Sequence, residues 1–209
     1  MNALDVLHRA GIRRLPTDTE AIAEHFGIKL VSYSSVARIY ERDMAELYRI
    51  SRQGYSFVVD GRYVCAINEN SCGETRRRWT IAHELSHCLL GHIRDGRLCC
   101  TPEEERAADR FAAELLAPLA VVNFCGVTSA EELMRLCRLS RKAAEIRFGQ
   151  LDARRREAAR SRFSDTRAEA LSSAELKTVS DFSFFITEYI FNKKGGCSVL
   201  SGGAVRALP

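Results

Sequence analysis

Two histidines with a glutamate between them stand four positions apart in the segment HELSH, at residues 83–87. Histidines at this spacing on a helix lie about 40° apart around the axis, so His83 and His87 can bind one metal ion from the same side. Glu84 lies one step further round, where its carboxylate can reach a water molecule on the metal rather than the metal itself. The pattern is typical of a metallohydrolase in which Glu84 is the general base.

A third protein ligand is needed, because two imidazoles leave a catalytic zinc site incomplete. Glu105 follows His87 by eighteen residues, and Asp109 stands four residues further on. This spacing suits a zincin whose third ligand is glutamate, with Asp109 accepting the other ring proton of a ligand histidine. Alternatively, Glu103, Glu104 and Glu105 form only an acidic first turn that the helix dipole favours. We expect the acidic turn and the metal ligand to coexist, with Glu103 and Glu104 exposed and Glu105 turned inward.

Two nitrogen ligands and one oxygen ligand suit zinc best among common cellular metals, so we expect one zinc ion per chain. The metzincin pattern is excluded, because it requires glycine at 90 and histidine at 93, where this chain has Leu90 and Ile93. We place His92 at the end of the helix. Cys88 points roughly 100° away from the preceding ligand, so we expect it in the core.

Two helices must position these residues. The first is expected from residue 74 to about residue 90, with Gly91 ending it. The second begins after Thr101, because Thr101 and Glu104 can form a capping box and a proline suits the first turn. It ends before Pro118. We therefore expect the metal site between two consecutive helices.

A small sheet precedes these helices. Residues 55–60 and 62–68 flank Asp60-Gly61, which is a strong signal for a hairpin turn with positive φ angles. The other expected elements are a helix over 17–26, strands over 28–33 and 47–51, and helices over 130–137, 140 to about 160, and 182–191. The pattern predicts an α+β fold with a small β-sheet packed on a helical core.

The composition is that of an ordinary globular protein, with 46% apolar and 28% charged residues among 209. The best apolar run, residues 111–124, is broken by Glu114, Pro118 and Asn123, so we expect no membrane span and no membrane partner. The first residues lack the basic start and long apolar stretch of a signal peptide. We therefore expect a cytoplasmic protein whose eight cysteines stay reduced.

Net charge is +4, which does not require a polyanionic partner. Between Arg135 and Arg167, however, there are eleven basic and four acidic residues, and the segment could be taken for a DNA-binding helix-turn-helix. Apolar positions at helical spacing predict instead a face packed on the catalytic core; they are Leu133, Leu136, Ala144, Ile146 and Leu151. We favour packing, or a surface that docks a substrate protein, over nucleic-acid binding.

Two blocks of sequence resemble the ImmA/IrrE family of metallo-endopeptidases. They are WTIAHELSHCLLGH at residues 79–92 and ERAADRFAAELLAP at residues 105–118. The resemblance extends from about residue 5 to residue 155. Ser86 stands where the family usually has glycine, and Ala117 where methionine commonly precedes the proline. Neither departure removes a catalytic group.

The resemblance implies a zincin-like domain, which we assign to residues 1–160. Residues 161–209 lie outside the resemblance, and their sequence pattern predicts a C-terminal extension that is partly helical with a disordered end. It implies that His83, His87 and Glu105 are zinc ligands and that Glu84 is the general base.

The resemblance also implies a bacterial, phage or mobile-element setting and cleavage of a cytoplasmic helix-turn-helix repressor. The alternative is a zinc-containing regulator that binds a transcription factor or DNA without proteolysis. Retention of Glu84 favours the enzyme, because a structural site has no use for a base beside its ligands. Zincins generally hold the substrate along an edge strand, and we expect residues 62–68 to form that edge.

Overall fold

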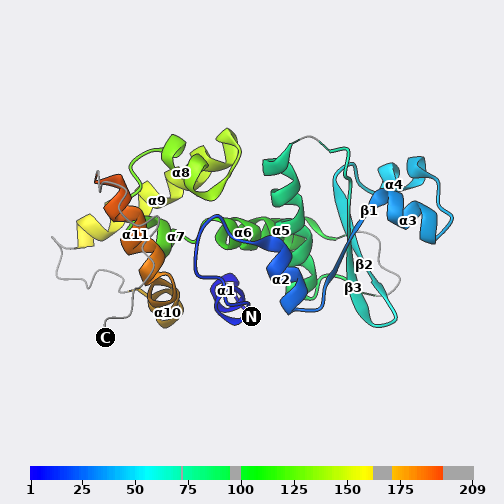
Figure 1. Cartoon of the computed structure of the whole chain (residues 1–209), viewed down its shortest axis with the longest axis horizontal. Helices are drawn as coiled ribbons and strands as arrows, with labels where there is room; N and C mark the ends of the chain where they lie inside the picture. Colours follow the sequence, from blue (N-terminus) through cyan, green and yellow to red (C-terminus); the bar gives the residue numbers. More distant parts are fainter. Residues whose placement is uncertain (72, 95–99, 162–170, 195–209) are drawn as a thin grey trace, which may run out of the picture.

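The computed structural model describes residues 1–71, 73–94, 100–161 and 171–194. The molecule is elongated, with the sheet at one end and the C-terminal helices at the other (Figure 1). Helices α5 (Glu74–Leu90) and α6 (Pro102–Leu116) lie between these ends. The expected α+β class, with a small sheet against a helical core, is confirmed.

The sheet contains strands β1 (Lys29–Ser32), β2 (Gly54–Val59) and β3 (Arg62–Ile67), in the order β1-β3-β2. Strand β3 pairs antiparallel with β2 through the expected hairpin turn and parallel with β1. The expectation that residues 62–68 form an edge strand is therefore wrong. The parallel partner arrives from a distant part of the chain and covers that side of β3, so β2 and β1 are the edges.

Helices cover both faces of the sheet. Helix α3 (Tyr33–Ile39) and helix α4 (Met44–Ile50) pack on one face, where Tyr33 and Leu47 form a buried cluster with Ala66 of β3. Helix α5 covers the other face, toward which Cys65 and Ile67 point. Successive side chains of a strand point to opposite faces of the sheet. Alternate residues of β3 therefore join the small cluster on one face and the main core on the other.

The expected strand over 47–51 is wrong, because helix α4 occupies this segment. Asp43 caps the helix by accepting a hydrogen bond from the Ala45 N–H at 3.1 Å. The helix buries Leu47 against the sheet. Helical capping and burial of a single apolar position decide the structure here, whereas a short apolar pattern cannot separate helix from strand.

Helices α5 and α6 form the centre of the core. Helix α5 ends at Gly91, which adopts the left-handed conformation with φ 73°. Helix α6 begins with the expected capping box, in which Thr101 and Glu104 exchange hydrogen bonds. Leu85 and Ala112 are fully buried in the core. The two helices pack against each other, and Glu105 near the start of α6 lies beside His83 and His87 in the second half of α5.

The remaining helices surround this pair. They are α1 (Ala3–Arg9), α2 (Thr19–His25), α7 (Leu119–Phe124), α8 (Ala130–Cys137), α9 (Arg141–Ser161), α10 (Ser173–Asp181) and α11 (Ser183–Lys193). The helix expected over 182–191 is α11, whereas α1, α7 and α10 are not among the elements expected from the sequence. None of the helices in the described ranges is both long and apolar enough to cross a membrane.

The C-terminal helices pack on the same core as the rest of the chain. Phe182, Phe185 and Ile186 join the main apolar cluster, and Asp181 lies 2.6 Å from His8 of α1 between Oδ2 and Nδ1. The division between residues 1–160 and 161–209 stays a prediction. The end expected to be disordered, residues 195–209, lies outside the described residues.

Candidate metal centre

Helix α5 brings His83 and His87 together, as their spacing predicts. Their Nε2 atoms lie 3.0 Å apart, and the rings meet edge to face. The side chain of His87 is 4% exposed and that of His83 is 18% exposed. Two imidazole nitrogens therefore point to one place at the border between core and solvent.

Glu105, in the first turn of α6, completes a three-residue group. Its carboxylate oxygens lie 3.3 Å from His83 Nε2 and 3.6 Å from His87 Nε2. One ligand atom from each of the three residues lies within 4.8 Å of the others. Glu103 instead pairs with Arg106, and Glu104 caps the helix. Of the three consecutive glutamates, Glu105 is the one that faces both histidines. Its side chain is nevertheless 49% exposed, so the expectation that it turns inward is wrong.

Asp109, one turn after Glu105, lies on the other side of the His83 ring. Its Oδ1 is 3.0 Å from His83 Nδ1. A carboxylate at this position favours the tautomer with the proton on Nδ1, which leaves the Nε2 lone pair directed toward His87 and Glu105. The structure thus brings together all of the site residues selected from the sequence around His83.

Glu84 is buried beside this group, and Ser56 of β2 contacts it. Ser56 Oγ donates a hydrogen bond to Glu84 Oε2 at 2.6 Å. Burial raises the pKa of Glu84, while the Ser56 hydrogen bond and the charge of His83 oppose that rise. Ser56 is not among the site residues expected from the sequence. The only signal was a hydroxyl on the inward face of a largely apolar strand.

Two further residues contact the second nitrogen of His87. Its Nδ1 lies 3.1 Å from His92 Nδ1 and 3.3 Å from Cys100 Sγ. Burial, together with the charges of His83 and His92, lowers the pKa of His87 to about 4. His87 is therefore neutral at pH 7, which is the state that metal binding requires. His92 lies just after the end of α5, as expected, whereas Cys100 is not among the residues expected at the site.

Cys88 follows His87 but turns away from the site. It is buried, and its Sγ lies 3.7 Å from Cys65 Sγ of β3. Both thiols are free in the structure, as are those of Cys125 and Cys137. The expectation that Cys88 is a core residue is confirmed, because it belongs to the main apolar cluster.

A sequence model of the peptidase family described as the IrrE N-terminal-like domain matches residues 23–149 of the chain. This range contains the sheet and the helices α5 and α6 that position the site. The chain belongs to this family. No curated protein and no solved structure gives a significant match. Membership of the IrrE N-terminal-like family confirms the resemblance found in the two sequence blocks.

The group of donors in this IrrE N-terminal-like domain suits a metal ion. Two imidazole nitrogens and one carboxylate are a donor set that zinc prefers, and three protein ligands leave a position open for chemistry. His87 is neutral at pH 7 and His83 has Asp109 behind it, as a ligand histidine needs. The residues present therefore fit a catalytic metal.

A cleft of about 220 Å³ opens beside these residues. His83, Glu84 and Asp109 line one side of it, and Gly54 at the start of β2 lines another. Trp79, one turn before His83 on α5, also lines the cleft. A peptide entering here would lie between the edge strand β2 and the candidate ligands.

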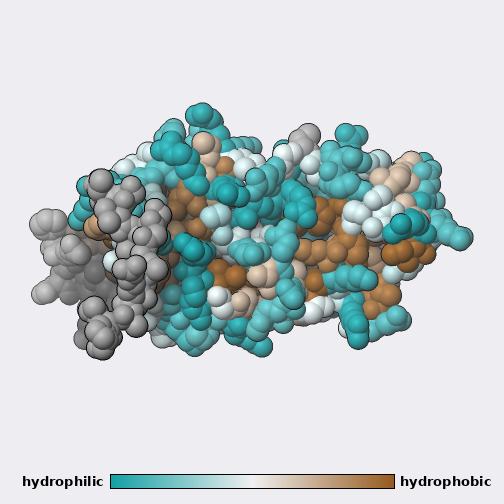
Figure 2. Space-filling model, in the orientation of Figure 1, coloured by the Kyte–Doolittle hydropathy of each residue, from teal (hydrophilic) through white to brown (hydrophobic). Residues whose placement is uncertain are grey.

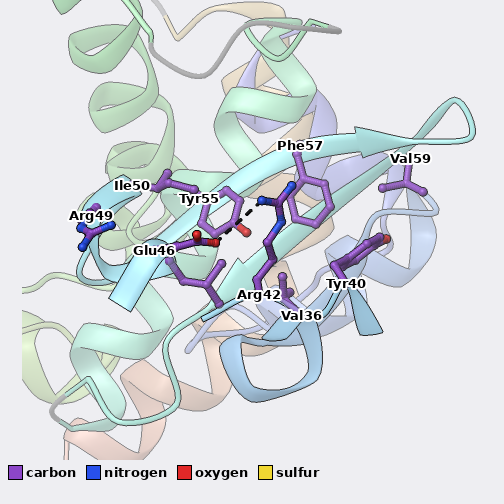
Figure 3. Close-up of a pocket in the computed structure, with 10 residues that line it drawn as sticks. Val36, Tyr40, Arg42, Glu46, Arg49, Ile50, Tyr55, Phe57 and Val59 are labelled. Atoms are coloured by element: carbon purple, nitrogen blue, oxygen red, sulfur yellow. Dashed lines mark ion pairs between the residues drawn. The ribbon is translucent and has the colours of Figure 1, made fainter. Parts of the chain in front are cut away.

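A separate apolar groove lies on the opposite face of β2, between this strand and helices α3 and α4 (Figure 3). Tyr55 and Phe57 stack along it with ring centroids 5.3 Å apart, and Arg42 pairs with Glu46 nearby. Figure 2 shows apolar surface at this end of the molecule. The lining of the groove contains none of the candidate ligands, so strand β2 separates it from the site.

Proposed function

We propose that this protein is a zinc-dependent endopeptidase that cleaves a cytoplasmic helix-turn-helix transcriptional repressor of the phage or mobile-element type, and so relieves repression. The observation that carries the proposal is the convergence of His83, His87 and Glu105 beside the buried carboxylate of Glu84. Membership of a peptidase family supports a protein substrate. The resemblance to ImmA/IrrE endopeptidases supports the repressor.

In this proposal His83, His87 and Glu105 hold one zinc ion. The bound zinc would act as a Lewis acid and lower the pKa of a water molecule. Asp109 would hold the proton on His83 Nδ1, which keeps Nε2 available as a donor. The low pKa of His87 supports its role as a neutral ligand.

Glu84 would act as the general base and then as the general acid. Its carboxylate would take a proton from the water molecule that attacks the peptide carbonyl. It would then return that proton to the leaving amine. Burial favours this role, because a raised pKa brings the carboxylate closer to the operating pH. Ser56 holds Oε2, so the hydrogen bond leaves the other carboxylate oxygen for proton transfer.

The substrate segment would lie extended along β2. This strand pairs with β3 on one side, and its residues Gly54 and Ser56 lie beside the cleft and Glu84. Pairing of an added strand uses main-chain hydrogen bonds, which require little of the substrate sequence. The outer edge of β2, rather than β3, is therefore the proposed recognition edge.

The proposal is tested by replacing the native gene with the Glu84→Gln allele. Because Glu84 is proposed to contact water and not the metal, the variant should retain zinc and thermal stability while hydrolysis falls by about 10²-fold or more. Mass spectrometry of protein N-termini should then show a new terminus within a helix-turn-helix regulator in wild-type cells only. Relief of repression by the zinc-loaded variant would instead support the non-proteolytic regulator.

A further inference from the structure

A second cavity, of about 580 Å³, lies next to the candidate metal centre. Its walls come from the first half of α5, from α6 and from the start of α9. Gln53, Trp79 and Asp109 line both this cavity and the cleft at His83 and Glu84. The cavity therefore adjoins the cleft in which a peptide bond would be cut.

The walls of the cavity are largely apolar. Trp79 and Leu139 pack against the main core, and Ala143 and Ile146 of α9 stand opposite α5 and α6 in the lining. Ile146 is 57% exposed, so the expectation that it packs on the catalytic core is wrong. Ala144 and Leu151 on the same helix are fully buried and face the core instead. An exposed isoleucine beside an active-site cleft is available to contact a substrate side chain.

Two cations line the cavity. Arg76 and Lys142 are exposed there, and neither forms an ion pair with the residues that the structure describes. Arg147 also lines the cavity, but it is buried and pairs with Glu114. Asp109, the acidic residue in the lining, is engaged by His83. Positive formal charges therefore outnumber negative ones in the lining, which favours an acidic group.

We infer that this cavity is the specificity pocket of the enzyme. It receives a large apolar side chain next to the scissile bond, and Arg76 and Lys142 favour an aspartate or glutamate one or two positions further along the substrate. The inference rests on the proposed function. The three shared lining residues place the cavity next to the cleft, so a side chain held there lies near the reacting bond, and the two cations select its acidic neighbour.

A cleavage profile tests the specificity. Full-length, zinc-loaded wild type is incubated with a synthetic library of randomised peptides, and the cut sites are read by mass spectrometry. We expect Leu, Ile, Met or Phe at one side of the cut, followed by Asp or Glu. Ile146→Asp should reduce cleavage at apolar sites by about tenfold, since losing a hydrophobic pocket contact has an effect of this order. Lys142→Glu should abolish the preference for Asp or Glu, because the new carboxylate opposes the charge of Arg76.

The chain offers matched controls for both variants. Leu176 on α10 is 56% exposed, so Leu176→Asp places the same charge at an equally exposed apolar position away from the cavity. Lys177→Glu repeats the charge reversal on that helix. Both controls should retain the wild-type profile. Because Ile146 and Lys142 are exposed, all four variants should unfold near the wild-type temperature.

Binding can be measured without cleavage, because Trp79 is the only tryptophan of the chain and lines the cavity. The Glu84→Gln protein is titrated with blocked hexapeptides that contain Leu-Asp, Ala-Asp or Leu-Lys, and Trp79 fluorescence is followed. The Leu-Asp peptide should bind about tenfold more tightly than either of the others.

The cleavage profile and the Trp79 titration together distinguish failure of the proposed pocket from failure of the proposed peptidase activity. Cleavage by the wild type with a profile that Ile146→Asp and Lys142→Glu leave unchanged would overturn the pocket and leave the peptidase standing. Selective binding of the Leu-Asp peptide without any cleavage would overturn the peptidase and leave the pocket standing. A Trp79 signal that does not distinguish the three peptides would overturn the pocket in either case.

Discussion

The hydroxyl group of Ser56 lies 2.6 Å from Glu84 Oε2 and links the edge strand β2 to helix α5. The same hydroxyl lies 3.3 Å from Cys65 Sγ and 3.4 Å from the Glu84 carbonyl oxygen. Ser56 is thus held between the sheet and the helix, and it fixes the orientation of the carboxylate. In the proposed reaction it is a positioning residue.

Ser56→Ala should lower kcat by about 10- to 100-fold while zinc content and KM change little. A hydrogen bond to a charged group contributes about 1.5–3 kcal/mol, and about 1.4 kcal/mol corresponds to a factor of ten in rate. Steady-state kinetics on a cleaved library peptide would measure this effect. Ser34→Ala removes a hydroxyl from an exposed position on α3 and serves as the control. An unchanged kcat for Ser56→Ala would show that Glu84 is oriented by other contacts.

Glu105→Ala should remove the metal, because Glu105 supplies the only carboxylate of the three-residue group. Glu103→Ala should not, because Glu103 lies in the same helical turn but pairs with Arg106. Elemental analysis after dialysis would give about one zinc ion per chain for wild type and Glu103→Ala. Full zinc occupancy in Glu105→Ala would show that another residue is the third ligand.

Asp109→Asn should weaken zinc binding by about 10- to 100-fold, the usual effect of losing a carboxylate behind a ligand histidine. The variant keeps the size of the side chain but removes the charge that faces His83 Nδ1 at 3.0 Å. Competition with a chromophoric chelator would measure the affinity. Asp152→Asn is the control, because Asp152 is half exposed and pairs with Arg156 within α9. Equal affinities for the two variants would contradict the role of Asp109.

The elements predicted correctly from the sequence are those with local signals. The capping box of Thr101 and Glu104, the left-handed Gly91 and the Asp60-Gly61 turn each depend on residues within a few positions of one another. The relation of His83 to His87 is local as well, because helical geometry alone places them on one side. These features need no knowledge of the tertiary fold.

The features that the sequence did not reveal depend on contacts between distant segments. Strand β1 reaches β3 from outside the hairpin and makes β3 the middle strand. Ser56 reaches Glu84 across 28 positions. Ile146 has the apolar character of a core residue, yet its helix turns it toward a cavity. Hydrophobic pattern and intrinsic propensity describe one segment at a time, so they cannot predict which distant segments come into contact.

Glu132 of α8 ties α11 to the rest of the chain. Its Oε1 lies 2.6 Å from Lys193 Nζ and accepts a hydrogen bond from the Tyr189 hydroxyl at 2.7 Å, and its Oε2 accepts one from the Thr128 N–H at 2.8 Å. Burial raises the pKa of Glu132, but these hydrogen bonds oppose it and lower the value to about 2, from an ordinary 4.5. The folded state therefore favours the ionised carboxylate.

A carboxyl group whose pKa is lower in the folded than in the unfolded state stabilises the fold above its unfolded pKa, and this contribution is lost as pH falls toward the folded pKa. Glu132→Gln should therefore unfold at a lower urea concentration than wild type at pH 7, and the difference should narrow between pH 4.5 and pH 3. Glu188→Gln is the control, because Glu188 lies on α11 in an exposed pair with Arg14. A difference that stays constant from pH 7 to pH 3 would mean that packing around the side chain, rather than its charge, holds α11 on α8.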